Sequence, residues 1–270
     1  MLLEETLGDA DFGKWDGSVI ALLIELIFEV FGEFYDGNNG HILEWLCVTI
    51  SKSMVIINDE LWATTHGIPS GTWVTLLINC LINKCITALT IFRNKEDPTV
   101  EDFYSVVDYV MGDDKIMGSS GPMAKVFNLF TVKEVAESLG MDCTNGDKTP
   151  ITSPSQSFDK LSFLKRHLRE HPTLSGYVGL LSVDTIMNTL QWMDCSKDVD
   201  EVLGGKARSV QVEAYIHSPS LFKRLTNIIA EALPFQPLFT EAQVIKILQS
   251  DDGYEKLNVA AGKDVSWLTQ

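Results

Sequence analysis

The sequence predicts an α+β fold in which an antiparallel sheet with packed helices is followed by a mostly helical region. Two short runs rich in Val, Tyr and Ile flank Gly112-Asp113-Asp114 within residues 102–120. This pattern is typical of two antiparallel strands joined by a tight turn. Residues 72–92 carry apolar side chains at helical spacing. Because the later sequence turns helical, we expect one domain at 1–180 and a helical domain at 181–270.

The first domain alternates strands and helices. Turn residues separate its apolar segments, and Pro69 and Gly71 mark a loop that opens a helix. Pro122 stands near the first turn of another helix, where its fixed φ is tolerated. In chain order we expect a strand at 9–12, a helix at 18–34, a turn at 35–40, a helix at 72–92, the strand pair at 102–120, a helix at 122–139 and a loop at 144–157.

A second hairpin and a set of helices complete the expected fold. The hairpin is formed by residues 160–168 and 173–181, and the chain is helical from Ser182 onward. Ser218 caps a helix, and Thr240 with Gln243 has the spacing of a capping box before a further helix.

The composition is that of a globular protein. Of the 270 residues, 45% are hydrophobic and 21% are charged, and this hydrophobic fraction is enough for a sizeable core.

The apolar stretch at 18–28 carries Glu25 and is too short for a bilayer, so we expect no membrane span. The acidic N-terminus lacks the basic region of a signal peptide. Five cysteines without a Cys-x-x-Cys pair indicate free thiols in a reducing compartment.

The net charge of −16 limits the inferences about nucleic acids. Long-range electrostatics of this sign repel a polyanion, so bulk charge does not indicate nucleic-acid binding. A nucleic-acid site in this chain requires local basic groups or bound cations.

Aspartates are placed where a two-metal site would need them. Two divalent cations about 3.5–4 Å apart need shared hard oxygen ligands. Asp113 and Asp114 lie at the tip of the predicted hairpin, and a third carboxylate must come from another strand. Asp11 is the candidate, with Asp16 five residues further on. The alternative is a surface turn with ordinary solvated carboxylates.

A polar series opens the helix at 72–92. Ser70-Gly71, Thr75 and Asn79 follow the pattern Ser-Gly-x3-Thr-x3-Asn, in which a glycine-containing loop leads into a helix. Thr75 and Asn79 are four residues apart and share one helix face. The alternative interpretation is polar filler on a helix surface.

Five segments in order resemble motifs A to E of a viral RNA-dependent RNA polymerase of the picornavirus-like branch of positive-strand RNA viruses. They read DFGKWD, PSGTWVTLLIN, YVMGDD, NGDKT and FLKR. The resemblance covers residues 9–192 and includes Trp192-Met193-Asp194, which is similar to the start of that family's thumb. It implies a polymerase palm at 1–180, a thumb at 181–270, and fingers that are largely absent from this chain.

The resemblance assigns catalytic roles to four residues. It implies that Asp11 and Asp113 are the principal ligands of two Mg²⁺ ions, for which Mn²⁺ can substitute. Asp114 would be a weaker or supporting ligand. Lys148 corresponds to the lysine that acts as general acid for the pyrophosphate leaving group. An ammonium near that group would offset developing charge and donate a proton.

The resemblance also implies a substrate-binding set and an RNA contact. Asp16 and Asn79 would recognise the ribose 2′-hydroxyl, and Ser70, Gly71 and Thr75 would support that network and the templating base pair. In the hairpin between palm and thumb, the primer grip, Lys165 or Arg166 would lie near the phosphates of the nascent strand. Lys165 and Arg166 are therefore the expected RNA-binding residues.

The implied partners are template and nascent RNA, nucleoside triphosphates and the fingers region of the same polyprotein. The implied location is the host cytoplasm, at membrane-associated replication complexes. We expect the isolated fragment to be inactive without the fingers.

One alternative is a catalytically inactive viral relic or truncated scaffold that keeps the palm fold. Another is a zinc site at His167 and His171, which lacks an obvious third ligand.

Overall fold

The computed structural model describes residues 5–34, 40–72, 74–174, 176–192 and 198–250. It divides into two compact units, Met1–Leu164 and Lys165–Gln270. The sequence-based division at residue 180 stays a prediction of the palm–thumb boundary; the compact units divide earlier, after Leu164. Met193 and Asp194, which belong to the thumb-like stretch, lie outside the described residues.

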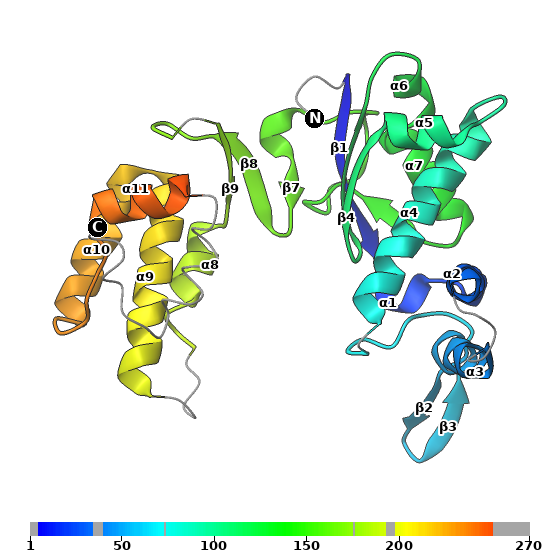
Figure 1. Cartoon of the computed structure of the whole chain (residues 1–270), viewed down its shortest axis with the longest axis horizontal. Coiled ribbons are helices and arrows are strands. Elements are labelled where there is room, and N and C mark those ends of the chain that lie inside the picture. Colours follow the sequence, from blue (N-terminus) through cyan, green and yellow to red (C-terminus); the bar gives the residue numbers. More distant parts are fainter. Residues whose placement is uncertain (1–4, 35–39, 73, 175, 193–197, 251–270) are drawn as a thin grey trace. The chain divides into compact units, whose positions relative to one another are not determined.

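A four-stranded antiparallel sheet organises the first unit (Figure 1). Its strand order is β4-β5-β1-β6, so the first strand of the chain lies between two strands from much later in the sequence. The strands are β1 (Thr6–Gly13), β4 (Val107–Met111), β5 (Asp114–Ser119) and β6 (Asp142–Thr144).

The predicted hairpin is formed by β4 and β5. Met111 pairs with Asp114, which leaves Gly112 and Asp113 as a two-residue turn. Gly112 has a left-handed φ of 67°, and hairpin turns favour glycine at this first central position. The Gly112-Asp113 turn therefore projects from the end of the sheet with a backbone conformation that its sequence supports.

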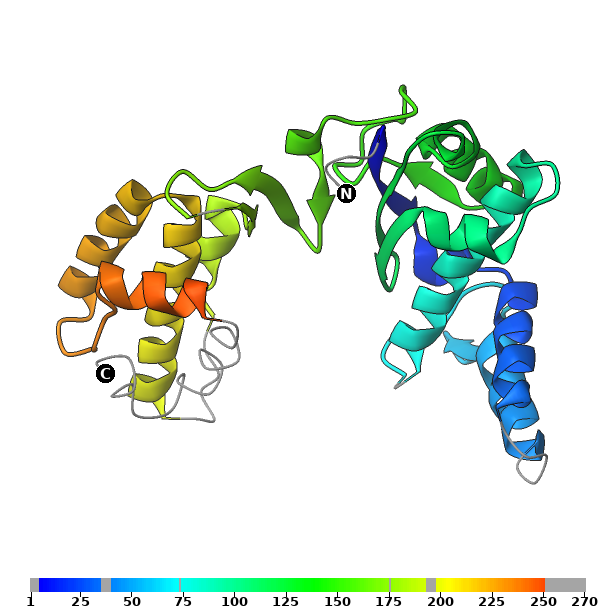
Figure 2. The same cartoon turned by 45° about the horizontal axis from the view of Figure 1, so that its top comes forward.

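Two helices from distant parts of the sequence pack against this sheet (Figure 2). They are α4 (Thr75–Asn94) and α7 (Leu129–Ser138). Ile78, Ile82 and Ile86 on α4 are fully buried, as their helical spacing requires for one core-facing stripe. The sheet and these helices form one hydrophobic core.

The helix expected at 122–139 is two helices, α6 (Met123–Val126) and α7. Asn128 interrupts it with an extended backbone and caps α7 through its side chain, which accepts from the amides of Phe130 and Thr131. The Thr131 hydroxyl oxygen accepts from the Asn128 amide in return. A reciprocal capping box of this kind starts a new helix.

The remaining elements of the first unit are short or peripheral. A β2–β3 hairpin turns through Asn58 and Asp59, both with left-handed φ, and was not among the expected elements. The full set is α1 (Trp15–Ser18), α2 (Ala21–Glu33), α3 (Gly40–Ser51), β2 (Met54–Ile57), β3 (Glu60–Ala63), α5 (Val100–Ser105), η1 (Phe158–Lys160) and β7 (Ser162–Phe163).

Helix α4 is the described helix that is long and apolar enough to cross a membrane by length and composition. The sequence-based expectation placed no such segment in the chain. In the structure α4 contacts α7 and β4, and its isoleucine stripe is buried in the core. This is the packing of a core helix.

The second unit is a hairpin followed by helices (Figure 1). Strands β8 (Arg166–Glu170) and β9 (Tyr177–Leu180) pair antiparallel, as expected for a second hairpin. The helices are α8 (Val183–Asn188), α9 (Val199–His217), α10 (Pro219–Ala232) and α11 (Glu241–Gln249). The expected caps at Ser218 and at Thr240 with Gln243 are both present.

The buried Asp9 of β1 connects three segments of the first unit. Its carboxylate accepts from the Gly146 amide at 3.1 Å and from the Ser162 amide at 2.7 Å, and the Ser162 hydroxyl donates to it at 3.0 Å. Buried carboxylates need such partners. Asp9 therefore fixes the loop between β6 and β7 against the central strand, two residues before Lys148.

We predict that Ile82→Ala lowers the free energy of unfolding by about 2–5 kcal/mol, because it leaves a cavity beneath α4. Leu77→Ala on the same helix is the control, since Leu77 is 51% exposed. That control should change stability by less than about 0.5 kcal/mol in urea unfolding. Equal losses in the two variants would contradict the packing of α4 described above.

We also predict that Gly146→Ala lowers the free energy of unfolding by about 1–3 kcal/mol, because overpacking displaces neighbouring groups. A Cβ at Gly146 would lie 2.5 Å from Asp9 Oδ2 and 2.7 Å from Ser162 Oγ. Gly32→Ala in α2 is the control, since nothing lies within 4 Å of its added Cβ. A Gly146→Ala chain as stable as the wild type would show that Asp9 does not hold this loop tightly.

Candidate active site

A pocket of about 380 Å³ lies at the end of β1. Asp11, Asp16, Asp113 and Lys148, four of the predicted site residues, line it. These residues come from three separate segments of the chain. The full lining is Asp11, Phe12, Gly13, Lys14, Trp15, Asp16, Gly17, Asp113 and Lys148.

The register of the sheet brings these segments together. On one side of β1, Ala10 pairs with Lys115, so Asp11 follows directly beside the Gly112-Asp113 turn. On the other side, Asp11 pairs with Thr144 of β6, and the loop that carries Lys148 begins just after. Two neighbouring strands thus deliver a carboxylate and an ammonium to the end of the central strand.

The donor set of the pocket suits a hard divalent cation. Asp11 and Asp113 offer carboxylate oxygens, which Mg²⁺ and Mn²⁺ prefer. Asp114 is the first residue of β5 and is not among the lining residues. The described residues hold no group of three or more His, Cys, Asp or Glu arranged around a metal position. Metal binding at Asp11 and Asp113, with Asp114 in support, stays a prediction.

The expected sugar-recognition residues are only partly assembled. The Ser70 hydroxyl donates to Asp16 Oδ2, which joins the loop before α4 to the segment after β1. Gly71 has a left-handed φ of 88° in that loop. Thr75 donates to the Pro69 carbonyl at 3.0 Å and so braces the loop. Asn79 lies one turn further along α4.

Asn79 has an unsatisfied acceptor. Its side chain is 6% exposed, and its Oδ1 atom has no hydrogen-bond partner within the described part of the chain. A buried amide oxygen without a donor costs free energy, and native structures leave few such atoms unpaired. Asn79 is not among the residues that line the pocket, and recognition of ribose by Asn79 stays a prediction.

Sequence reasoning missed Asn83, which holds the Gly112-Asp113 turn. Its Nδ2 donates to the carbonyls of Gly112 at 3.3 Å and Asp113 at 3.2 Å. The Gly112 amide donates to Cys80 Sγ at 3.1 Å. The available signal was the spacing, because Asn83 continues the series of polar residues four apart that begins at Thr75 and Asn79.

Sequence reasoning also missed a buried ion pair between β4 and β5. Lys115 Nζ lies 2.7 Å from Asp108 Oδ1, and both side chains are almost fully buried. Burial alone would raise the pKa of Asp108, but the Lys115 charge and the hydrogen bonds from Lys115 and Thr87 hold it below its ordinary value. The available sequence signal was Asp108 in the first predicted strand and Lys115 in the second, two positions apart in the strand register.

The two expected RNA-binding residues lie in different environments. Lys165 is exposed and has a left-handed φ of 61°. The Arg166 guanidinium forms a bidentate ion pair with Glu213 of α9, at 2.7 and 3.0 Å, and donates to the Gly179 carbonyl at 2.9 Å. Arg166 is thus engaged within the second unit, and RNA contact by either residue stays a prediction.

The zinc alternative has no support among the described residues. His171 is buried, its Nδ1 accepts from the amides of Thr173 and Leu174, and its Nε2 contacts the Tyr215 carbonyl at 2.9 Å. Both ring nitrogens are therefore occupied. His167 is exposed on β8.

Known proteins resemble this chain over most of its length. The family described as "Viral RNA-dependent RNA polymerase" matches residues 2–249. The replicase polyprotein of Drosophila C virus (strain EB) is 28% identical over 252 residues, 87% of this chain and 14% of that polyprotein. The genome polyprotein of Rice tungro spherical virus (strain Vt6) is 30% identical over 237 residues, 83% of this chain and 7% of that polyprotein.

A solved structure shares the fold. The "Sicinivirus 3Dpol RNA dependent RNA polymerase" superposes with a TM-score of 0.71 and 14% identity, over 96% of this chain and 52% of that one. The chain therefore has the α+β palm and thumb fold that the sequence predicted, and it spans about half of that polymerase and 14% of the Drosophila C virus polyprotein. With residues 2–249 matched by the family, this chain belongs to the viral RNA-dependent RNA polymerases.

Proposed function

We propose that this chain is the palm and thumb portion of a polymerase that adds ribonucleotides to an RNA 3′ end by a two-metal mechanism. The observation that carries the proposal is that Asp11, Asp113 and Lys148 line one and the same pocket. Membership of the viral RNA-dependent RNA polymerases supports the polymerase activity in general. Nucleoside triphosphates and template and nascent RNA are the substrates that this activity requires.

Asp11 and Asp113 are the residues that would hold Mg²⁺ or Mn²⁺ in this pocket. When bound, the cations would neutralise the triphosphate and activate the 3′ hydroxyl. That hydroxyl would give up its proton to water as its oxygen bonds to the α-phosphorus, and the bond between that phosphorus and pyrophosphate would break. Asp11 and Asp113 would fix the positions of these cations between β1 and the Gly112-Asp113 turn. The reacting groups would be oriented by that placement.

Lys148 supplies the proton in this proposal. Its ammonium lines the same pocket as both aspartates, on the loop that Asp9 ties to β1. Donation of that proton to the departing pyrophosphate offsets its developing charge. Lys14, which sequence reasoning did not include, adds a second positive charge to the lining and so counters the net charge of −16 locally.

Recognition of ribose is assigned to Asp16 and Asn79. The Ser70 hydroxyl orients Asp16, and the unpaired Asn79 Oδ1 needs a donor of the kind that a 2′-hydroxyl offers. A site built to bind a hydroxyl rejects the analogue that lacks it, because its own polar groups are left unpaired. Asn79 thereby supports discrimination against deoxyribonucleotides.

We predict that Asp113→Ala abolishes nucleotide incorporation in the polymerase that contains these residues, because a metal ligand is lost while the turn backbone is kept. Primer extension with Mg²⁺ is the assay, and circular dichroism checks that the variant folds. An Asp113→Glu variant, which keeps the carboxylate, should retain measurable extension. An Asp113→Ala enzyme that extends primers at the wild-type rate would contradict the assignment of Asp113 as a metal ligand.

We predict that Asn79→Ala lowers the ribo- to deoxyribonucleotide preference at least about tenfold, which corresponds to the loss of one well-placed hydrogen bond. The comparison is kcat/KM for matched nucleotides on one primer–template. Asn94→Ala on the same helix is the control, since the Asn94 amide donates to its own helix at Thr90. An unchanged ratio for Asn79→Ala would identify Asn79 as an ordinary core residue.

A further inference from the structure

A lysine buried directly behind the aspartate pair is the least expected group in the first unit. Lys115 follows Asp114 on β5, and its side chain is 0% exposed. Removing an ammonium from water costs several kcal/mol, and an apolar pair of similar volume commonly serves stability as well as a buried ion pair does. The presence of Lys115 therefore calls for a role beyond stability.

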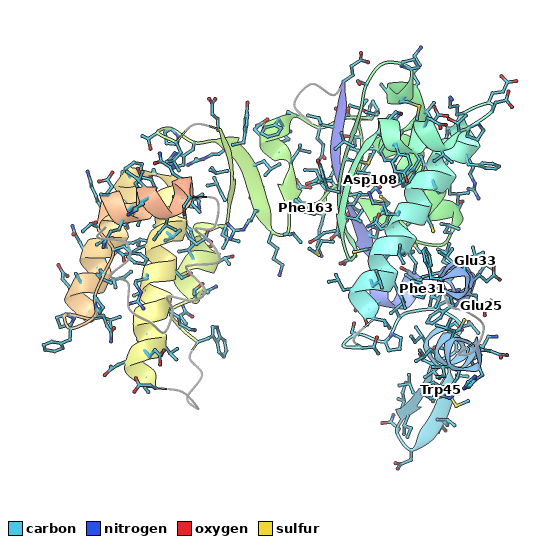
Figure 3. All side chains as sticks on the ribbon, in the orientation of Figure 1. Glu25, Phe31, Glu33, Trp45, Asp108 and Phe163 are labelled. Carbon is cyan, nitrogen blue, oxygen red and sulfur yellow. The ribbon has the colours of Figure 1, made fainter. Side chains whose placement is uncertain are left out.

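Three polar atoms surround the Lys115 ammonium. Nζ lies 2.7 Å from Asp108 Oδ1, 2.5 Å from Thr87 Oγ1 and 3.2 Å from Asn83 Oδ1. Thr87 in turn donates to Asp108 Oδ2 at 2.6 Å. A lysine has three donors and no acceptor, so Lys115 donates to Thr87 and Asn83 and forms an ion pair with Asp108. Figure 3 shows Asp108 where β4 faces α4.

The ammonium determines which way the Asn83 amide points. Its carbonyl oxygen must face Lys115, because Lys115 offers only donors. Its NH₂ group must then face the other way, towards the Gly112 and Asp113 carbonyls. An amide turned by 180° would present its oxygen to those carbonyls and its NH₂ group to the ammonium, so that both contacts would be repulsive.

Lys115 does not reach the pocket itself. It is absent from the pocket lining and has no solvent-exposed side-chain surface. It cannot contact substrate or metal, so it is not a catalytic residue. Its effect on the pocket must pass through Asn83 to the backbone that carries Asp113.

We propose that Lys115 is a positioning residue, which fixes the Asn83 amide and thereby holds the Gly112-Asp113 turn where Asp113 binds metal. This inference rests on the proposed function, because it assumes that Asp113 is a metal ligand. The Lys115–Asp108 pair serves geometry at the metal pocket, and its contribution to stability is separable from that role.

Manganese binding to the 270-residue chain tests the proposal without requiring activity. Electron paramagnetic resonance measures free Mn²⁺ during titration, and urea unfolding measures stability in the same samples. Lys115→Met should weaken Mn²⁺ binding by about 10–100-fold, the usual effect of losing a group that orients a ligand. It should also lower stability, because the Asp108 carboxylate loses its fully buried cationic partner and keeps only Lys84 and Thr87.

The double variant Lys115→Met with Asp108→Asn separates the two effects. Removing both charges should return most of the stability, while the Asn83 amide stays unconstrained and Mn²⁺ binding stays weak. Lys84→Met is the matched control. The Lys84 ammonium lies 3.2 Å from Asp108 Oδ2, but it makes no described contact with the Asn83 side chain. It should bind Mn²⁺ as the wild type does.

Asn83→Asp gives an independent check, because it keeps an acceptor for Lys115 and removes the donor to the turn. It should weaken Mn²⁺ binding as Lys115→Met does. Wild-type affinity in Lys115→Met, or in the double variant, would overturn the positioning role. The Asp113→Ala variant distinguishes failure of the positioning role from failure of the metal assignment. If Asp113→Ala binds Mn²⁺ like the wild type, Asp113 is not a metal ligand.

Discussion

The antiparallel pairing of β1 with β5 is the constraint on which the pocket depends. Because Ala10 lies opposite Lys115, Asp11 is placed beside the Gly112-Asp113 turn although the two are separated by about a hundred residues of sequence. A slip of one residue would turn every side chain of β1 to the other face of the sheet. The register is held by buried contacts: a Cβ at Gly8 would lie 2.6 Å from Leu129, and Asp9 accepts from Gly146 and Ser162.

Helix α4 links the pocket to the core through a series of polar residues four positions apart. Thr75 braces the loop that carries Ser70, and the buried Asn79 Oδ1 has no hydrogen-bond partner among the described residues. Asn83 holds the turn of Asp113, and Thr87 contacts the buried ion pair of β4 and β5. The neighbouring row of buried isoleucines fixes the rotation of the helix. A single rigid element therefore sets the positions of the residues assigned to ribose and to metal, which is how precise sites are built.

The parts of this picture that depend on local pattern were predictable from the sequence. Strand alternation around Gly112 gave the hairpin, helical spacing gave α4, and the order of the motifs gave the candidate residues Asp11, Asp113 and Lys148. The role of Asp9 was not predictable, because its partners lie on other segments, 153 residues away in the case of Ser162. The Asp108–Lys115 pair left a signal within the hairpin, but the contact of Lys115 with Asn83 on α4 is visible only in the fold. The split of the helix at Asn128 was missed because Asn is tolerated within a helix and its cap is visible only in the fold.

The central claim is that Asp11 and Asp113, brought together by the β1–β5 register, bind the same cations. A double-mutant cycle of Mn²⁺ affinity with Asp11→Asn, Asp113→Asn and the double variant tests it most directly, because groups that share a ligand are energetically coupled and independent groups are additive. We expect each single substitution to remove most of the binding and the double variant to lose little more. Two losses that add, or no loss in either single variant, would contradict a shared metal site.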